Sequence, residues 1–139
     1  MKSNAHIDIR RTVSGAADIP YEAIARRILG ATYELSLTIC GDDLARRMYK
    51  EYRKSRLKNE PKRPRSYASN VLSFPYSKTS GEIFLNARKA EREARALGTT
   101  AKKRMALLLV HGCFHLKGHD HGGTMERLER NTLRACGLL

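Results

Sequence analysis

Strict alternation of apolar and polar residues from Tyr33 to Ile39 constrains the fold more than any other feature of this 139-residue chain. Successive side chains of a β-strand point to opposite faces of the sheet, so the apolar members of such a segment share one face. Those members are Tyr33, Leu35, Leu37 and Ile39. The segment from His6 to Arg10 alternates in the same way, with Ile7 and Ile9 on one side. Both segments predict half-buried strands.

Apolar residues recur at helical spacing between and after these strands. The first such segment lies between Pro20, which favours a helix start, and Gly30, which favours its end. The second begins after Gly41 with Asp42 as its cap, and its other face is strongly basic. The expected buried faces are Tyr21, Ile24, Ala25 and Ile28 in the first helix and Leu44, Met48 and Tyr52 in the second.

Two further strands and three helices are expected in the second half of the chain. Residues 71–74, closed by Pro75, and residues 82–85 predict a hairpin-like pair of strands around a turn at Ser80-Gly81. Helices are expected from Asn86 to Leu97, from Thr99 or Thr100 to Lys117, and from Thr124 to about Ala135. The predicted fold class is therefore mixed α/β: one small domain over residues 1–139, with about four strands in a mixed sheet and about five helices.

The charge of the chain favours a polyanionic partner. Lys and Arg number 27 against 14 acidic residues, a formal net charge of +13. Ten of these cations lie between Arg46 and Arg65, so residues 42–69 are expected to form a basic helix that continues into a basic loop. Nucleic acid is the partner class that such a segment fits best, although a solvated basic surface would have the same composition.

Cysteine usage and hydropathy favour a cytoplasmic location. Three widely spaced cysteines without a CxxC pair argue against a disulfide framework and suit a reducing compartment. The first ten residues do not resemble a secretory segment, and the longest aliphatic run, Met105 to Val110, is too short to cross a bilayer. No membrane partner is expected.

Three histidines with metal-ligand spacing form the main functional signal. On a helix, His111 and His115 lie at i and i+4 and therefore share a face. Gly118 allows the chain to reverse, which would bring His121 back as a third ligand. Residues 99–121 are thus expected to form a metal-binding helix and turn that hold one zinc ion per chain, with a fourth position left for water. Copper, nickel and iron also accept imidazole ligands.

Neighbouring residues leave several alternatives. Cys113 is expected to face away from the ion as a small core residue, whereas His119 is a competing ligand or a turn residue. Asp120 either handles protons and orients a ligand histidine or merely forms the turn. The spacing His-x3-His-x5-His also matches the metzincin proteases, but Gly112 replaces the glutamate that serves them as general base. Proteolysis is therefore disfavoured.

Two motifs resemble the YbeY-type endoribonucleases, which are ribosomal RNA maturation factors. The family signature HGxxHLxGYDH is similar to residues 111–121, with His119 in place of tyrosine. A second family element, Thr followed by Asp or Asn and VLSFP, is similar to Ser69-Asn70-Val71-Leu72-Ser73-Phe74-Pro75. The resemblance implies a zinc ion held by His111, His115 and His121, a mixed α/β fold, a cytoplasmic location, and cleavage of single-stranded RNA in small-subunit ribosomal RNA processing.

The resemblance also implies an arginine near the metal. The family has it in a Tyr-Arg pair, which matches Tyr52-Arg53. Because the loop after this pair is longer here than in the family, Arg63 and Arg65 remain alternatives, and Arg53 is favoured because it ends an amphipathic helix. A guanidinium group there would clamp a phosphate oxygen.

The resulting hypothesis is a zinc-dependent endoribonuclease with Arg53 and Asp120 as catalytic residues. The expected RNA-binding residues are Arg53, Arg63, Arg65, Lys102 and Lys103. The expected partners are ribosomal RNA and the small ribosomal subunit, with a ribosomal protein or an assembly GTPase as a further candidate. Six tyrosines, three phenylalanines and no tryptophan give no obvious base-stacking platform, so phosphate contacts should dominate. The alternative is a noncatalytic, zinc-stabilised assembly factor that binds RNA.

Overall fold

A four-stranded sheet lies at the centre of the molecule in this computed structural model, which describes residues 6–55, 62–119 and 122–139. Its strands are β1 (Ile7–Arg11), β2 (Glu34–Cys40), β3 (Val71–Ser77) and β4 (Ser80–Asn86). They are arranged in the order β1-β2-β4-β3. The first two pairs are parallel and the β3–β4 pair is antiparallel, so the sheet is mixed as predicted.

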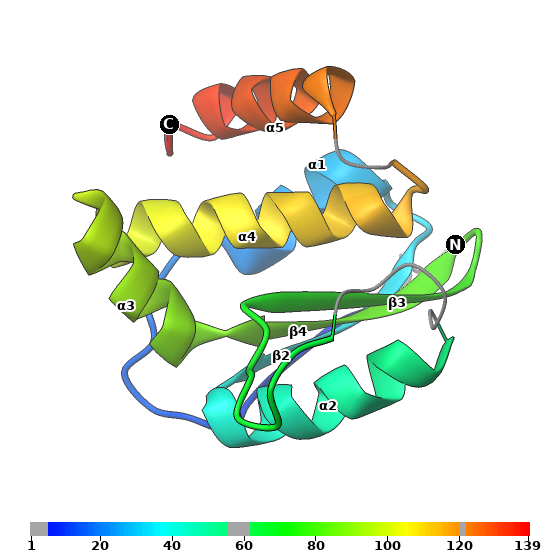
Figure 1. Ribbon diagram of the computed structural model, residues 1–139. Helices are drawn as coiled ribbons and strands as arrows, with labels where there is room; N and C mark the ends of the chain where they lie inside the picture. The colour runs from blue at the N-terminus through cyan, green and yellow to red at the C-terminus, as the bar shows by residue number, and fades with distance from the viewer. Residues whose placement is uncertain (1–5, 56–61, 120–121) are drawn as a thin grey trace.

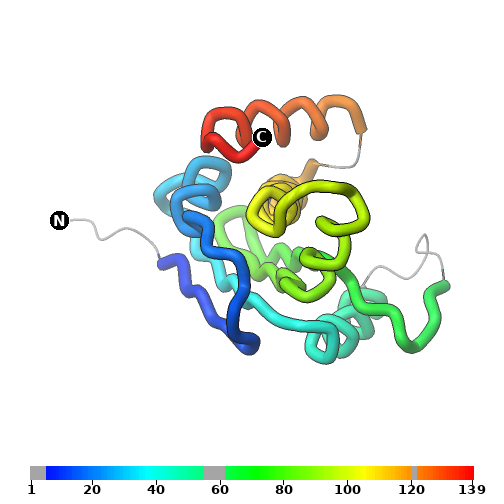
Figure 2. Tube along the Cα trace, turned by 90° about the vertical axis from the view of Figure 1, so that its left-hand side faces the viewer, coloured from blue at the N-terminus to red at the C-terminus, as the bar shows by residue number. Residues whose placement is uncertain are grey.

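Five helices among the described residues cover the two faces of this sheet. They are α1 (Tyr21–Leu29), α2 (Asp42–Ser55), α3 (Ala87–Leu97), α4 (Ala101–Leu116) and α5 (Gly123–Ala135). Figure 1 shows α4 along one face with α1 beside it, α2 on the opposite face and α5 stacked on the outer side of α4. Figure 2 shows the same layers from the side. None of the described helices is long and apolar enough to span a membrane.

Helix α4 is the central element of the larger core. It contacts α1, α3, α5, β3 and β4, and its buried residues occur on all sides of its axis. A helix that is apolar all round must be covered on every side, and this explains why the run from Met105 to Val110 carries no polar face. The expected inward residues Tyr33, just before β2, and Leu35, Leu37 and Ile39 within it are all buried in this core. Thr38 and Cys40 on the other face are buried too, so the end of β2 is covered on both sides rather than half-buried as predicted.

Helix α2 and the other face of the sheet enclose a second, smaller core. Its most buried helix residues are Ala45 and Tyr49, whereas the expected residues Leu44, Met48 and Tyr52 are half-buried beside them. The buried stripe is thus centred one residue further along the chain than predicted. Tyr49 accounts for this shift, because its ring packs against Tyr67 in the segment that precedes β3.

Pro75 does not end the third strand, contrary to the prediction. β3 continues to Ser77, and its register with β4 shifts between Pro75 and Ser77. A proline has no N–H to donate, and in a central strand the N–H of every residue has a neighbouring strand as its partner. β3 is an edge strand with one neighbour, so a residue there can lack an N–H at less cost. The turn therefore lies between Ser77 and Ser80 rather than at Ser80-Gly81.

Asn86 fixes the junction between β4 and α3. Its side chain accepts a hydrogen bond from the amide of Lys89, as expected of a helix cap, and donates to Asp42 and to the carbonyl of Ser69. Arg92 also donates to Asp42, and these hydrogen bonds lower the pKa of the Asp42 carboxyl to about 2. The start of α2, the start of α3 and the segment before β3 are thereby joined.

Two glycines allow α4 to lie close against the sheet. A Cβ on Gly112 of α4 would lie 3.1 Å from Ser73 Oγ and 3.1 Å from Val71 Cγ2. A Cβ on Gly81 of β4 would lie 2.6 Å from Tyr33 Oη and 2.8 Å from Leu116 Cδ2. Larger residues at either position would push the helix away from the strands.

The variant Gly81→Ala should therefore be less stable than the wild type. The added methyl group has no space between Tyr33 and Leu116, and overpacking of this kind costs about 1–3 kcal/mol of unfolding free energy. Chemical denaturation measures the loss. Gly123→Ala is the matched control, because a Cβ there meets nothing within 4 Å. Equal stability of the two variants would show that a methyl group at position 81 fits between Tyr33 and Leu116.

Candidate functional site

Two histidine rings meet at the carboxyl end of α4. His111 and His115 are four residues apart, so one helical turn places both on the same face, and their Nε2 atoms are 2.9 Å apart. The helix then ends at a glycine in the left-handed conformation, Gly118, with φ +89°. The amide of Gly118 donates to the carbonyl of His115 and the next amide donates to Phe114, which is the Schellman arrangement expected of a glycine-terminated helix.

The Nδ1 atom of each histidine ring lies next to a hydrogen-bond acceptor. Nδ1 of His111 lies 2.5 Å from Glu129 Oε2, and Nδ1 of His115 lies 3.0 Å from the carbonyl oxygen of His119. A carbonyl only accepts hydrogen bonds and an ionised carboxylate does the same, so both Nδ1 atoms carry the proton. The two Nε2 atoms face one another at hydrogen-bond distance, and Nε2 is the nitrogen through which a ring that holds its proton on Nδ1 can bind a metal ion.

This donor pair fits a metal ion. Two nitrogens bound to one tetrahedral zinc ion lie about 3.3 Å apart, so the pair would need to open by only about 0.4 Å. Among residues 6–55, 62–119 and 122–139 there is no group of three His, Cys, Asp or Glu side chains that could hold the ion. The predicted third ligand, His121, and its neighbour Asp120 lie outside the described residues.

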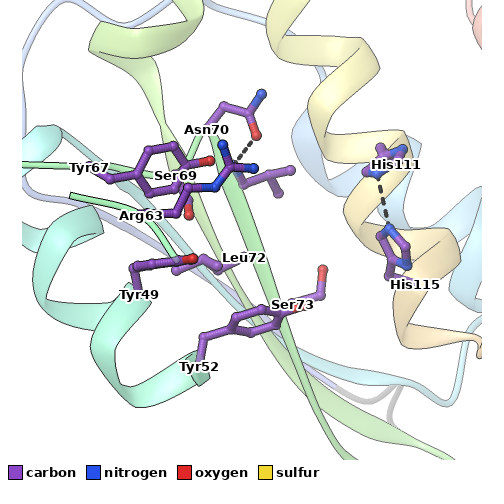
Figure 3. Close-up of a pocket in the computed structure, with 11 residues that line it drawn as sticks. Tyr49, Tyr52, Arg63, Tyr67, Ser69, Asn70, Leu72, Ser73, His111 and His115 are labelled. Atoms are coloured by element: carbon purple, nitrogen blue, oxygen red, sulfur yellow. Dashed lines mark hydrogen bonds between the residues drawn. The ribbon is translucent and has the colours of Figure 1, made fainter. Parts of the chain in front are cut away.

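The histidine pair lines a cavity of about 310 Å³ between α2, β3 and α4. Figure 3 shows His111 and His115 on one side and tyrosines on the other, with the residues of β3 between them. The lining residues are Tyr49, Tyr52, Arg63, Tyr67, Ser69, Asn70, Val71, Leu72, Ser73, His111 and His115. The second motif of the sequence, Ser69 to Pro75, therefore contributes five residues to the same cavity as the histidine motif.

Hydrogen bonds fix the β3 side of the cavity. Ser73 is buried and its hydroxyl donates to the carbonyl of Gly112, 2.9 Å away, between the two histidines. The side-chain oxygen of Asn70 accepts a hydrogen bond from the backbone amide of Val71, and the side-chain NH2 group of Asn70 donates to Glu93. Glu93 is in turn paired with Arg104 of α4. This wall is therefore tied to both α3 and α4.

The predicted cations differ in their distance from this cavity. Arg63 lines it, with its guanidinium carbon 4.8 Å from the centre of the Tyr67 ring. Arg53 follows a lining tyrosine on α2 but is not itself among the described lining residues, since consecutive helix residues point about 100° apart. Arg65 is exposed outside the lining.

Lys102 and Lys103 lie on the first turn of α4, at the opposite end from the histidines. Both are exposed. Lys103 precedes His111 by eight residues, which corresponds to about 12 Å along the helix axis. These two cations are therefore separated from the cavity.

The structure also places the other residues that sequence analysis weighed. Cys113 is fully buried, as predicted, and burial raises the pKa of its thiol well above the usual range. The ring of His119 packs edge-on against Phe114, with ring centroids 5.6 Å apart. Gly112 fits against β3 only because it lacks a side chain, so the glutamate of a zinc peptidase would not fit at this position.

Glu129 is one of the site residues that sequence analysis missed; Tyr49 and Tyr67 of the cavity lining are others. Glu129 is only 7% exposed and lies on α5, eighteen positions after His111. A signal was present: Met125, Glu129 and Leu133 recur every four residues, so an acidic side chain stands on the buried stripe of an amphipathic helix. A buried carboxylate needs a hydrogen-bond donor or a cation as its partner, so this position pointed to a polar contact inside the fold.

Together the fold and the site define a class of protein: a small mixed α/β domain in which a helix presents two histidines to a polar cavity. The chain belongs to the family described as Endoribonuclease YbeY, whose family model matches residues 2–136.

Individual relatives agree with this assignment. The Endoribonuclease YbeY of Methylibium petroleiphilum is 34% identical over 135 residues, covering 89% of this chain and 84% of the relative. That of Alkalilimnicola ehrlichii is 33% identical over 146 residues, covering 95% and 87%. The solution structure of TM1509 from Thermotoga maritima shares the fold with a TM-score of 0.61 at 17% identity, covering 93% of this chain and 87% of that one.

Glu129→Gln should weaken metal binding by about 10- to 100-fold, because the ring of His111 loses a charged acceptor that fixes its tautomer. Competition between the protein and a chelator for zinc measures the affinity. Glu126→Gln is the matched control, since Glu126 lies on the same helix and is exposed. Melting of both metal-free variants reports any loss of folding separately. Equal zinc affinities for the two variants would contradict the role given to Glu129.

Proposed function

We propose that this chain is a zinc-dependent endoribonuclease that cleaves single-stranded ribosomal RNA during maturation of the small ribosomal subunit. The observation that carries the proposal is the convergence of two Nε2 atoms, 2.9 Å apart, at the wall of a polar cavity. Support comes from the net charge of +13 and from relatives named Endoribonuclease YbeY. The expected setting is the cytoplasm, with ribosomal RNA and the small subunit as partners and a ribosomal protein or assembly GTPase as a further candidate.

The proposed metal site consists of His111, His115 and His121. When bound, the zinc ion would act as a Lewis acid toward a phosphate oxygen and would activate a water molecule. Glu129 and the His119 carbonyl keep the protons on the Nδ1 atoms, so the two helix histidines bind through Nε2 without reorienting. Asp120 is the proposed proton-handling residue next to His121.

A phosphodiester gathers negative charge as its phosphorus is attacked, so a cation beside the metal should stabilise the transition state. Arg63 has the position for this role, because it lines the same cavity as the two histidines. Its five N–H donors suit two phosphate oxygens at once. Arg53 remains the second candidate, whereas Arg65, Lys102 and Lys103 are proposed to contact the RNA backbone further away.

His115→Ala should abolish both zinc binding and RNA cleavage, because it removes one of the two Nε2 donors. The measurement is cleavage of an end-labelled single-stranded ribosomal RNA fragment, with zinc analysis of each protein. His6→Ala serves as the control, since it removes an exposed histidine that does not line the cavity. Cleavage that survives in zinc-free His115→Ala would refute a metal-dependent reaction. A wild type that binds zinc and RNA without cutting would instead favour a noncatalytic assembly factor.

Arg63→Ala should lower kcat/KM by about 10- to 100-fold, since a charge-assisted hydrogen bond to the substrate contributes about 1.5–3 kcal/mol. Arg95→Ala is the control for lost charge, because Arg95 is exposed on α3 outside the cavity lining. Arg53→Ala is compared in the same assay. A large effect of Arg53→Ala with none of Arg63→Ala would assign the phosphate contact to Arg53.

A further inference from the structure

The side of the cavity that faces the histidines is aromatic. Tyr49 and Tyr52 come from α2 and Tyr67 from the segment before β3 (Figure 3). The Tyr49 and Tyr67 rings meet edge to face, with centroids 4.9 Å apart, and Tyr49 is stacked with Tyr52 at 6.4 Å. Half of the six tyrosines of the chain are thus gathered at one site, although they are spread over nineteen positions of the sequence.

The hydroxyl group of Tyr49 has no hydrogen-bond partner among the described residues. The residue is only 7% exposed, yet it lines the cavity. Burial of a hydroxyl without a hydrogen-bond partner is unfavourable, and few such groups occur in native proteins. A molecule in the cavity that came within reach of this oxygen could both accept a hydrogen bond from it and donate one to it.

Tyr33 provides an internal comparison. Its hydroxyl is also buried without a described partner, and the residue is 4% exposed. Tyr33 does not line the cavity, however, and its hydroxyl packs close to Gly81 on the sheet. The two tyrosines are therefore similarly buried, and they differ in that only Tyr49 belongs to the lining of the cavity.

The chemistry of the lining fits one nucleotide. The tyrosine side offers aromatic surface to a base, buried and half-buried polar groups offer hydrogen bonds to its edge, and Arg63, which lies over the Tyr67 ring together with Lys89, offers a cation for its phosphate. The cavity volume of about 310 Å³ is at the lower end of the range for small-molecule sites. Such a space admits a single unstacked base and excludes a double helix.

We infer that this cavity is a subsite for one unpaired nucleotide of the RNA, with its base on the tyrosine side and the Tyr49 hydroxyl bonded to the base edge. The inference rests on the proposed function, because the adjoining phosphate then lies beside His111 and His115. It also gives a physical reason for preferring single strands: a base held in a duplex cannot enter the cavity.

Tyr49→Phe tests the subsite, since it removes one oxygen and keeps the ring. Binding of a short labelled single-stranded RNA to the metal-free protein is measured by fluorescence anisotropy, which separates binding from cleavage. The Kd should rise about threefold to tenfold, the effect of one lost hydrogen bond. Tyr33→Phe is the matched control and should leave Kd unchanged. Melting should show Tyr49→Phe to be at least as stable as the wild type, because no hydrogen bond within the described protein is lost.

An abasic version of the same RNA identifies what the hydroxyl contacts. If Tyr49 binds a base, the difference between Tyr49→Phe and wild type should disappear when the bases are absent but the sugars and phosphates remain. An unchanged Kd for Tyr49→Phe on intact RNA would overturn the subsite, and so would a penalty that persists on abasic RNA. Either result leaves the proposed function standing if the wild type cleaves RNA. Conversely, a base-dependent effect without cleavage would retain the subsite and refute the nuclease.

Discussion

The contact between α4 and β3 is the constraint on which the site depends. The hydroxyl of Ser73 donates to the carbonyl of Gly112, and the absence of a side chain on Gly112 lets the strand come this close. Glycine inside a helix costs about 1 kcal/mol relative to alanine, so packing against the strand must offset that cost. Because His111 and His115 flank the contact, their distance from the rest of the cavity is set by it.

Local patterns made much of the fold predictable. β2 and α1 were predicted correctly because alternation and helical spacing depend on neighbouring residues only. The caps at Asn86 and Thr100 were likewise visible, and both accept the expected amide hydrogen bond. Pro75 misled the prediction because its effect depends on whether the strand lies at an edge, which is a property of the whole sheet. The buried stripe of α2 was misplaced because alanine, here Ala45, gives a weak hydrophobic signal.

The difference between local sequence patterns and tertiary packing also explains which parts of the site could be predicted. The position of His111 and His115 on one face of α4 follows from their spacing of four residues. Glu129 and the tyrosines come from other elements, so their positions beside the histidines depend on how α2 and α5 pack. Composition alone suggested no stacking platform, since it counts tyrosines without showing which of them meet. The choice between Arg53 and Arg63 was open for the same reason, because it depends on where the segment before β3 lies.

The direction of α4 has an electrostatic consequence. Aligned peptide dipoles give a helix a partial negative charge at its carboxyl end and a partial positive charge at its amino end. His115 lies in the last turn, where this field favours a cation by about 0.3–1 kcal/mol at an exposed site. Lys102 and Lys103 add positive charge to the other end, whose first turn contains no acidic residue. The backbone of α4 therefore favours a positive charge at the end that carries the histidines and a negative charge at the end that carries Lys102 and Lys103.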